Sequence, residues 1–202
     1  RAMTVAIVIG ASGLVGGQLV QQLSAHASFE RVLSLGRRKL GLGGNKIEEH
    51  LVDFRDRASL AAAMTGDVLF SSLGTTLKKA GSKDAQWEVD HTFQLRAAEA
   101  AIEKGVKRYV LVSASTADAG SMLFYNRMKG ELDDAVQRLG FQACHLMRPG
   151  ILAGDRAESR PGEAFGLAAM QLLGKVPGLR KHRPIPAADV ARAMIAVALD
   201  PR

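Results

Sequence analysis

The chain has 202 residues, of which 47% are hydrophobic and 23% charged, and its formal net charge is +7 at pH 7. A chain of this length is typical of one domain, here residues 1–202, that buries roughly 70% of its unfolded surface. The positive charge favours anionic partners, but only 5% of the residues are aromatic and the basic residues are spread in small groups. We therefore expect one phosphorylated small ligand and no nucleic-acid partner.

The single cysteine, Cys144, has no partner for a disulfide within the chain, which is typical of a reducing compartment. Residues 5–20 are the one candidate for a targeting or membrane segment. They include four glycines, a serine and a glutamine, and only one arginine precedes them. We therefore expect a cytoplasmic protein without a membrane segment.

Apolar runs typical of strands buried on both faces alternate with amphipathic segments along the chain. The expected strands are residues 5–9, 31–35, 47–52, 68–72, 109–112 and 143–147. The expected helices are residues 14–25, 57–64, 85–104, 123–139, about 163–173 and about 187–199. This alternation predicts an α/β fold with a doubly wound parallel sheet, the Rossmann architecture, and helices on both faces. Residues 154–202 lose the alternation, and we expect them to form a small helical cap on the substrate side.

The sequence GASGLVG, residues 10–16, lies between the first strand and the first helix. Glycines at Gly10, Gly13 and Gly16 allow a tight turn, close approach of the backbone to a pyrophosphate and close packing of helix on strand. The helix that follows offers N–H groups and a positive dipole end to an anion. The pattern predicts a dinucleotide-binding loop, and a simple tight turn is the alternative.

The end of the second strand reads LSLGRRKL and places Arg37 and Arg38 where an NAD-binding protein has an acidic residue for the ribose 2′-hydroxyl. Two guanidinium groups cannot accept a hydrogen bond from that hydroxyl, but they can bind a 2′-phosphate. The pair therefore predicts NADP as the cofactor, and two solvated loop arginines are the alternative.

The sequence MLFYNRMKGELDDAV places Tyr125 and Lys129 four residues apart, on one face of a predicted helix. A lysine beside a tyrosine favours the phenolate and lowers the phenol pKa, which makes the tyrosine a usable acid or base for hydride-transfer chemistry. Ser113 and Ser115 precede this pair in VLVSAST. This order of residues predicts an oxidoreductase site.

The sequences SSLGTTLKKAG, YNRMKGELD and RPGILAGDRAESRPGE resemble the short-chain dehydrogenase/reductase family in its atypical, extended-like branch, and in that branch the Tat-interacting oxidoreductases and their bacterial relatives. The resemblance runs from Val5 to about Ala196. It implies an NADP(H)-dependent oxidoreductase that acts on a carbonyl or alcohol substrate. The alternative is a binding module that senses NADPH and turns over little or no substrate.

The resemblance implies cofactor contacts along the whole dinucleotide. It places Ser12, Gly13, Leu14 and Val15 at the pyrophosphate, Arg37 and Arg38 at the 2′-phosphate, and Asp53 and Phe54 beside the adenine. It places Leu73 and Gly74 under the cofactor, Tyr125 and Lys129 on the nicotinamide ribose, Leu152 at the nicotinamide, and Arg160 reaching back toward the cofactor. The catalytic serine is either Ser115, which extended-type spacing favours, or Ser113, which the most similar relatives favour.

One departure concerns Val89-Asp90-His91, where many extended members have Val-Asn, so a polar role of that asparagine is in doubt here. We interpret His91 and His145 as structural or surface residues. The remaining histidines, His26, His50 and His182, show no metal-ligand spacing, and we expect no metal site. The sequence leaves open whether the chain forms a homodimer or binds a protein partner. The predicted helix at 85–104 could be a dimer face, and it could equally be an ordinary amphipathic helix.

Overall fold

The structure is a computed structural model that describes residues 4–153 and 184–200. Six parallel strands form one sheet in the order β3-β2-β1-β4-β5-β6. They are β1 (Thr4–Ile9), β2 (Phe29–Gly36), β3 (Ile47–Leu51), β4 (Val68–Ser71), β5 (Arg108–Val112) and β6 (Ala143–Met147). This sheet confirms the predicted doubly wound Rossmann fold.

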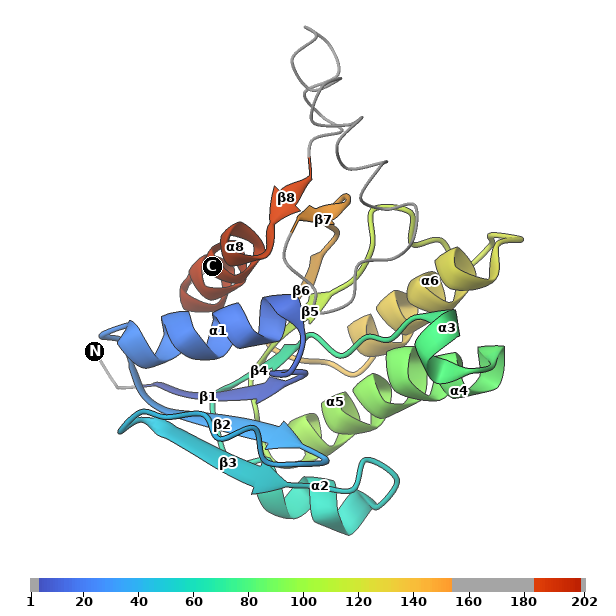
Figure 1. Ribbon diagram of the computed structural model, residues 1–202. Helices are drawn as coiled ribbons and strands as arrows, with labels where there is room; N and C mark the ends of the chain where they lie inside the picture. The colour runs from blue at the N-terminus through green and yellow to red at the C-terminus, as the bar shows by residue number, and fades with distance from the viewer. Residues whose placement is uncertain (1–3, 154–183, 201–202) are drawn as a thin grey trace, which may run out of the picture.

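Helices cover both faces of the sheet (Figure 1). One face carries α1 (Leu14–Ala25) and α8 (Ala187–Leu199), which pack side by side. The other face carries α2 (Arg57–Ala63), α5 (Phe93–Glu103) and α6 (Phe124–Gln137). Both faces of the sheet are therefore buried, which explains why its strands are continuous apolar runs.

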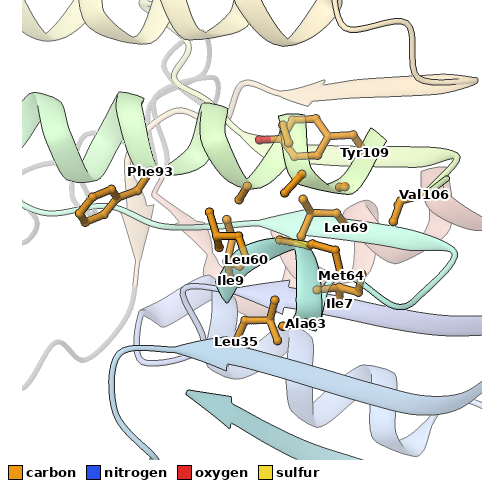
Figure 2. Close-up of a cluster of buried hydrophobic side chains, with 14 of the residues drawn as sticks. Ile7, Ile9, Leu35, Leu60, Ala63, Met64, Leu69, Phe93, Val106 and Tyr109 are labelled. Carbon is orange, nitrogen blue, oxygen red and sulfur yellow. The ribbon is translucent and has the colours of Figure 1, made fainter. Parts of the chain in front are cut away.

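Strand β1 shows how one apolar run supplies both halves of the core. Ile7 and Ile9 belong to the cluster under α2 and α5, whereas Ala6 and Val8 belong to the cluster under α1 and α8. All four side chains are fully buried. Figure 2 shows the first cluster, with Ile7 beside Leu69 of the neighbouring strand. The alternation follows from the two-residue period of a strand.

The sheet has its topological switch point at β1. Strand β2 pairs with one edge of β1 and β4 with the other, both parallel to it. The loops that leave the carboxyl ends of β1 and β4 therefore run in opposite directions, and open α/β sheets bind ligands at such a point.

One predicted helix, residues 85–104, is divided in the structure. It consists of α4 (Lys83–Trp87), a π-helical turn η1 (Glu88–Thr92) and α5. It is preceded by a short helix, α3 (Leu77–Ala80), that the sequence did not predict. The N–H of Phe93 donates to the carbonyl of Glu88, five residues earlier. Hydrophobic periodicity does not reveal such a turn, which is often found at functional sites.

Helix α8 belongs to the body of the fold, whereas we expected it in a cap formed by residues 154–202. Its buried residues Val190, Ala191 and Met194 join the cluster that includes Leu19 of α1. Ahead of it, β7 (Leu152–Ala153) and β8 (Ile185–Pro186) form a two-stranded parallel sheet. The expected helix at 163–173 lies outside the described residues.

Candidate functional site

The turn after β1 requires two of its three glycines for packing. Gly10 has φ +90°, and a Cβ there would lie 2.5 Å from the carbonyl carbon of Ser72. A Cβ on Gly16 would lie 2.0 Å from the carbonyl oxygen of Gly10. These glycines therefore bring the start of α1 close to the ends of β1 and β4.

Gly13 has a different environment, because it is the N-cap of α1 with an extended backbone at φ −88°. The nearest atom to a Cβ on this residue would be the Gly10 oxygen, at 3.3 Å. No side chain caps the helix, so its first N–H groups are left without a side-chain partner. Residues 10–16 thus form a glycine cradle at a helix N-terminus, the kind of place where proteins bind anions.

A cavity of about 390 Å³ runs from this turn to the end of β2. It is lined by six of the predicted cofactor residues, Gly10, Ser12, Arg37, Arg38, Phe54 and Leu73, and by Ala11, Ser34, Leu35, Gly36 and Leu40, which were not predicted. Arg37 and Arg38 are exposed, and neither has a hydrogen-bond or ion-pair partner among the described residues. The cavity thus joins an anion-binding helix end to two available guanidinium groups.

The loop that carries these arginines is held by Glu49 of β3. Its carboxylate accepts the backbone N–H groups of Leu40, Gly41 and Leu42 at 2.6, 2.9 and 3.1 Å. These bonds, chiefly that from Leu40, keep the pKa of Glu49 below its usual value. Nothing in the sequence pattern predicts this anchor, because a glutamate in a strand has the pattern of an ordinary solvated residue.

The predicted adenine residues have unequal exposure. Phe54 is buried and stacks on Phe93 with ring centroids 5.4 Å apart, so its ring edge forms one wall of the cavity. The carboxylate of Asp53 accepts the N–H of Arg55 at 2.8 Å, which fixes the turn after β3. Asp53 therefore shapes the loop and remains exposed.

Tyr125 and Lys129 lie one turn apart on α6 at the carboxyl end of β5. The side chain of Lys129 is buried, and its Nζ donates to the carbonyl of Val112 at 3.1 Å. Tyr125 is 41% exposed. Burial holds the pKa of Lys129 below its usual value, and the charges of Asp90 and Asp133 oppose this effect.

Asp90, which the sequence marked only as a departure, is a site residue. It is buried in η1, and its Oδ2 accepts the N–H of Thr75 at 2.8 Å. A Cβ on Gly74 would lie 3.6 Å from its Oδ1. Burial raises the pKa of Asp90 to about 6, against the opposing charge of Lys129 and the hydrogen bond from Thr75. The loop after β4 that we expect under the cofactor therefore rests on this carboxylate.

The two candidate serines have different surroundings. Ser113 is buried, and its Oγ donates to Oδ2 of Asp133 at 2.8 Å. The same carboxylate binds Arg148 through Nε at 3.0 Å and Nη2 at 2.8 Å. Ser115 is exposed, and its N–H donates to the carbonyl of Pro149 at 3.1 Å. Only the hydroxyl of Ser115 lies outside this buried network.

Gly130 allows the backbone at Asp118 and Ala119, in the loop that follows Ser113 and Ser115, to pass close to α6. A Cβ at this position would lie 2.1 Å from the backbone nitrogen of Ala119 and 2.3 Å from the carbonyl carbon of Asp118. A glycine within a predicted helix was the available signal for this close approach, and sequence reasoning missed it.

Four further residues were predicted at the cofactor: Leu14, Val15, Leu152 and Arg160. The side chain of Val15 is buried in the core, and Leu14 packs against the same cluster, so both side chains contribute to the core. Leu152 is half-buried in β7. Arg160 lies outside the described residues.

Residues 4–153 and 184–200 contain neither a metal-binding cluster nor a membrane-spanning helix. This part of the chain contains no group of three or more His, Cys, Asp or Glu side chains that could bind a metal ion. In the same part, every helix is too short or too polar to span a bilayer. His91 stacks on Trp87 with centroids 4.7 Å apart, and His182 lies outside the described residues.

The glycine cradle, the switch point and the cavity define an NAD(P)-binding Rossmann protein with an oxidoreductase-like fold. A family model described as NAD(P)H-binding matches residues 10–201. The protein fmp52 of Emericella nidulans is 38% identical over 176 residues, which cover 84% of this chain and 76% of that protein. Protein HTATIP2 of Rattus norvegicus is 37% identical over 193 residues, 93% of this chain and 78% of that protein. The chain therefore belongs to this NAD(P)H-binding family, whose short-chain dehydrogenase/reductase-like character the sequence predicted.

Solved structures agree on the fold. An oxidoreductase of the short-chain dehydrogenase/reductase family from Burkholderia thailandensis matches with a TM-score of 0.73 at 23% identity, covering 99% of this chain and 87% of that chain. The enzyme WbmH of Bordetella bronchiseptica, solved with NAD⁺, matches with a TM-score of 0.71 at 13% identity, covering 97% and 72%. At these identities the likeness concerns the fold alone.

The expected cytoplasmic location is contradicted by the curated relatives. The fmp52 proteins of Emericella nidulans, Aspergillus terreus and Eremothecium gossypii are named mitochondrial. The expectation rested on a single unpaired cysteine and on the composition of residues 5–20, and an unpaired cysteine indicates only a reducing environment, which is not a property of the cytoplasm alone.

Proposed function

We propose that this protein is an NADP(H)-dependent oxidoreductase that transfers hydride between the nicotinamide and a carbonyl or alcohol carbon. The observation that carries the proposal is the pairing of buried Lys129 with partly exposed Tyr125 on one face of α6, at the sheet edge that also holds the glycine cradle. A family member that only bound the dinucleotide would not need a proton donor at this edge.

The choice of NADP over NAD rests on Arg37 and Arg38. They line the cavity at the end of β2, where the ribose of the adenosine half would lie, and no acidic residue lines it. Charge-assisted hydrogen bonds to a phosphate contribute about 1.5–3 kcal/mol each, less where the guanidinium groups are exposed. A 2′-phosphate therefore matches this cavity better than a 2′-hydroxyl does.

The residues of the catalytic group have different tasks. When bound, NADP(H) supplies or accepts the hydride. Tyr125 donates a proton to the substrate oxygen during reduction and removes it during oxidation. Lys129 holds the nicotinamide ribose, and its positive charge favours the phenolate form of Tyr125.

Ser115 is the serine that we assign to the substrate oxygen. The hydroxyl of Ser113 already donates to the buried carboxylate of Asp133, whereas Ser115 is exposed at the carboxyl end of β5. A hydroxyl donor can stabilise the negative charge that develops on a carbonyl oxygen during reduction. The partner we propose is accordingly a small carbonyl or alcohol compound, and neither a nucleic acid nor a membrane.

An NADPH-sensing module is the second candidate, and the buried bond of Ser113 is the observation that favours it. If Ser113 were the family serine here, its hydroxyl would be unable to reach a substrate, although the cofactor would still bind. In that case Tyr125 and Lys129 would serve only to hold the ribose.

Tyr125→Phe separates the two candidates, because it removes only the phenol hydroxyl. An enzyme should lose roughly a hundredfold or more in turnover, the scale of general acid catalysis, with little change in NADPH affinity. Lys129→Met should lose turnover and NADPH affinity together. Equal carbonyl reduction by the wild type and Tyr125→Phe, with tight NADPH binding by both, would favour the sensing module.

A further inference from the structure

Asp90 is a buried carboxylate to which the proposed chemistry gives no task. The residue is 3% exposed and lies in the π-helical turn η1. Nε2 of Gln94 donates to the Asp90 carbonyl at 2.6 Å, and Ser71 donates to Oε1 of Gln94 at 2.7 Å. These bonds fix the backbone at Asp90, and the N–H of Thr75 binds its carboxylate. An ionised carboxylate is costly to bury without a compensating charge, so its surroundings should contain a cation.

Two carboxylates, Asp90 and Asp133, act on Lys129, and they differ in their other partners. Asp133 has its own cation, because Arg148 donates to it through two nitrogens and Ser113 through its hydroxyl. Asp90 accepts the N–H of Thr75, and the cation that acts on it is Lys129. The turn η1 packs against α6, and both Asp90 and Lys129 are buried, so their attraction acts within a buried region although no ion pair joins them among the described residues.

Other titratable residues on the same two elements as this pair include His91 on η1, and Glu131 and Tyr125 on α6. His91, next to Asp90, has its pKa lowered by burial, which favours its neutral form. Glu131 lies on α6, and its carboxylate is 3.8 Å from Nε of Arg127, so it has a cation of its own. Tyr125 lies one turn before Lys129 on the same helix.

We propose that Asp90 is a positioning residue that keeps Lys129 protonated at neutral pH and holds the Gly74–Thr75 loop under the cofactor. The inference rests on the proposed function, in which charged Lys129 binds the ribose. One carboxylate would thus set both the charge of the ribose-binding ammonium group and the path of the backbone opposite it.

The test uses Asp90→Asn, which retains an acceptor for the Thr75 N–H and removes the charge. In protein labelled with ¹³C-lysine, the ε-carbon signal of Lys129, assigned by its loss in Lys129→Arg, reports the ammonium group as pH is varied. Without Asp90 the titration midpoint should fall by about one pH unit or more, the effect of an opposite charge within a few ångströms. The alkaline loss of NADPH affinity should move down with it.

Asp134→Asn is the matched control, because it removes the same charge from an exposed position on α6. It should leave the Lys129 midpoint unchanged. An unchanged midpoint in folded Asp90→Asn would overturn the inference. Failure of the wild type to bind NADPH would instead contradict the proposed function, and the lysine titration would still be measurable.

The reciprocal experiment applies if Asp90→Asn does not fold. Coupling between two titrating groups is mutual, so Lys129→Met should raise the titration midpoint of the Asp90 carboxyl by about one pH unit or more. Protein labelled with ¹³C at the aspartate carboxyl carbons reports it. If the midpoint of Asp90 stays where it is in the wild type, the inference is wrong.

Discussion

Gly13→Val should abolish cofactor binding while leaving the fold intact. Gly13 has an ordinary extended backbone, which valine adopts readily, and the nearest atom to its Cβ is the Gly10 oxygen at 3.3 Å. We expect that contact and the weaker N-cap to reduce the unfolding free energy by about 1 kcal/mol. The added methyl groups would occupy the cradle at the N-terminus of α1, where we expect the pyrophosphate.

Thermal unfolding with and without NADPH measures the effect. At a hundred times its dissociation constant, NADPH should stabilise the wild type by about 2.7 kcal/mol. For a chain of this size that corresponds to a rise in Tm of about 5–11 °C. Gly13→Val should show no rise, and circular dichroism should show native secondary structure.

Gly16→Ala is the contrasting variant, because its Cβ would lie 2.0 Å from the Gly10 oxygen and 2.8 Å from Oγ of Ser72. We expect it to lower the unfolding free energy by about 1–3 kcal/mol or more before any ligand is added. A folded Gly13→Val protein that NADPH stabilises as strongly as the wild type would show that residues 10–16 form only a tight turn.

Three further predictions test other parts of the site. In parallel titrations, the wild type should bind NADPH at least about tenfold more tightly than NADH, a difference of about 1.4 kcal/mol. Replacing Arg37 and Arg38 by alanine should remove most of this preference. Equal affinities of the wild type for the two cofactors would refute the assignment. Gly130→Ala should reduce the unfolding free energy by about 1–3 kcal/mol or more in urea, because its Cβ would lie 2.1 Å from the Ala119 nitrogen, and a midpoint like that of the wild type would contradict this. As pH rises from about 4 to about 6, the unfolding free energy of the wild type should fall relative to that of Asp90→Asn. Burial raises the pKa of the native Asp90 carboxyl to about 6, so over this range the native carboxyl binds more protons than the unfolded one. Urea unfolding at a series of pH values measures this difference, and identical slopes for the two proteins would exclude it.

The sequence was sufficient for the sheet and for six of the residues that line the cavity, because both depend on local patterns. The run that ends at Ile9, the glycines that follow it and the arginines after β2 each lie within a few residues of one strand end. Parallel strands bring those ends to one edge, so residues predicted separately meet in one cavity.

The features that escaped prediction depend on contacts between distant segments. Glu49 anchors a loop through backbone N–H groups, which no side-chain pattern reveals. The sequence alone does not distinguish the surroundings of Ser113 from those of Ser115, because the hydrogen-bond partner of Ser113 is Asp133 on α6, 20 residues away. Asp90 is buried because a π-helical turn changes the helix phase, and hydrophobic periodicity does not report a single extra residue.

Transfer of deuterium from labelled NADPH tests the central claim most directly. The wild-type protein is incubated with each of the two epimers of NADPH that carry deuterium at C4 of the nicotinamide, and with a panel of aldehydes and ketones. Mass spectrometry of the alcohols then locates the label. The account predicts deuterium on the former carbonyl carbon of at least one compound, from one epimer only, and roughly a hundredfold less product with Tyr125→Phe. Tight binding of NADPH with no labelled alcohol from any compound would contradict it.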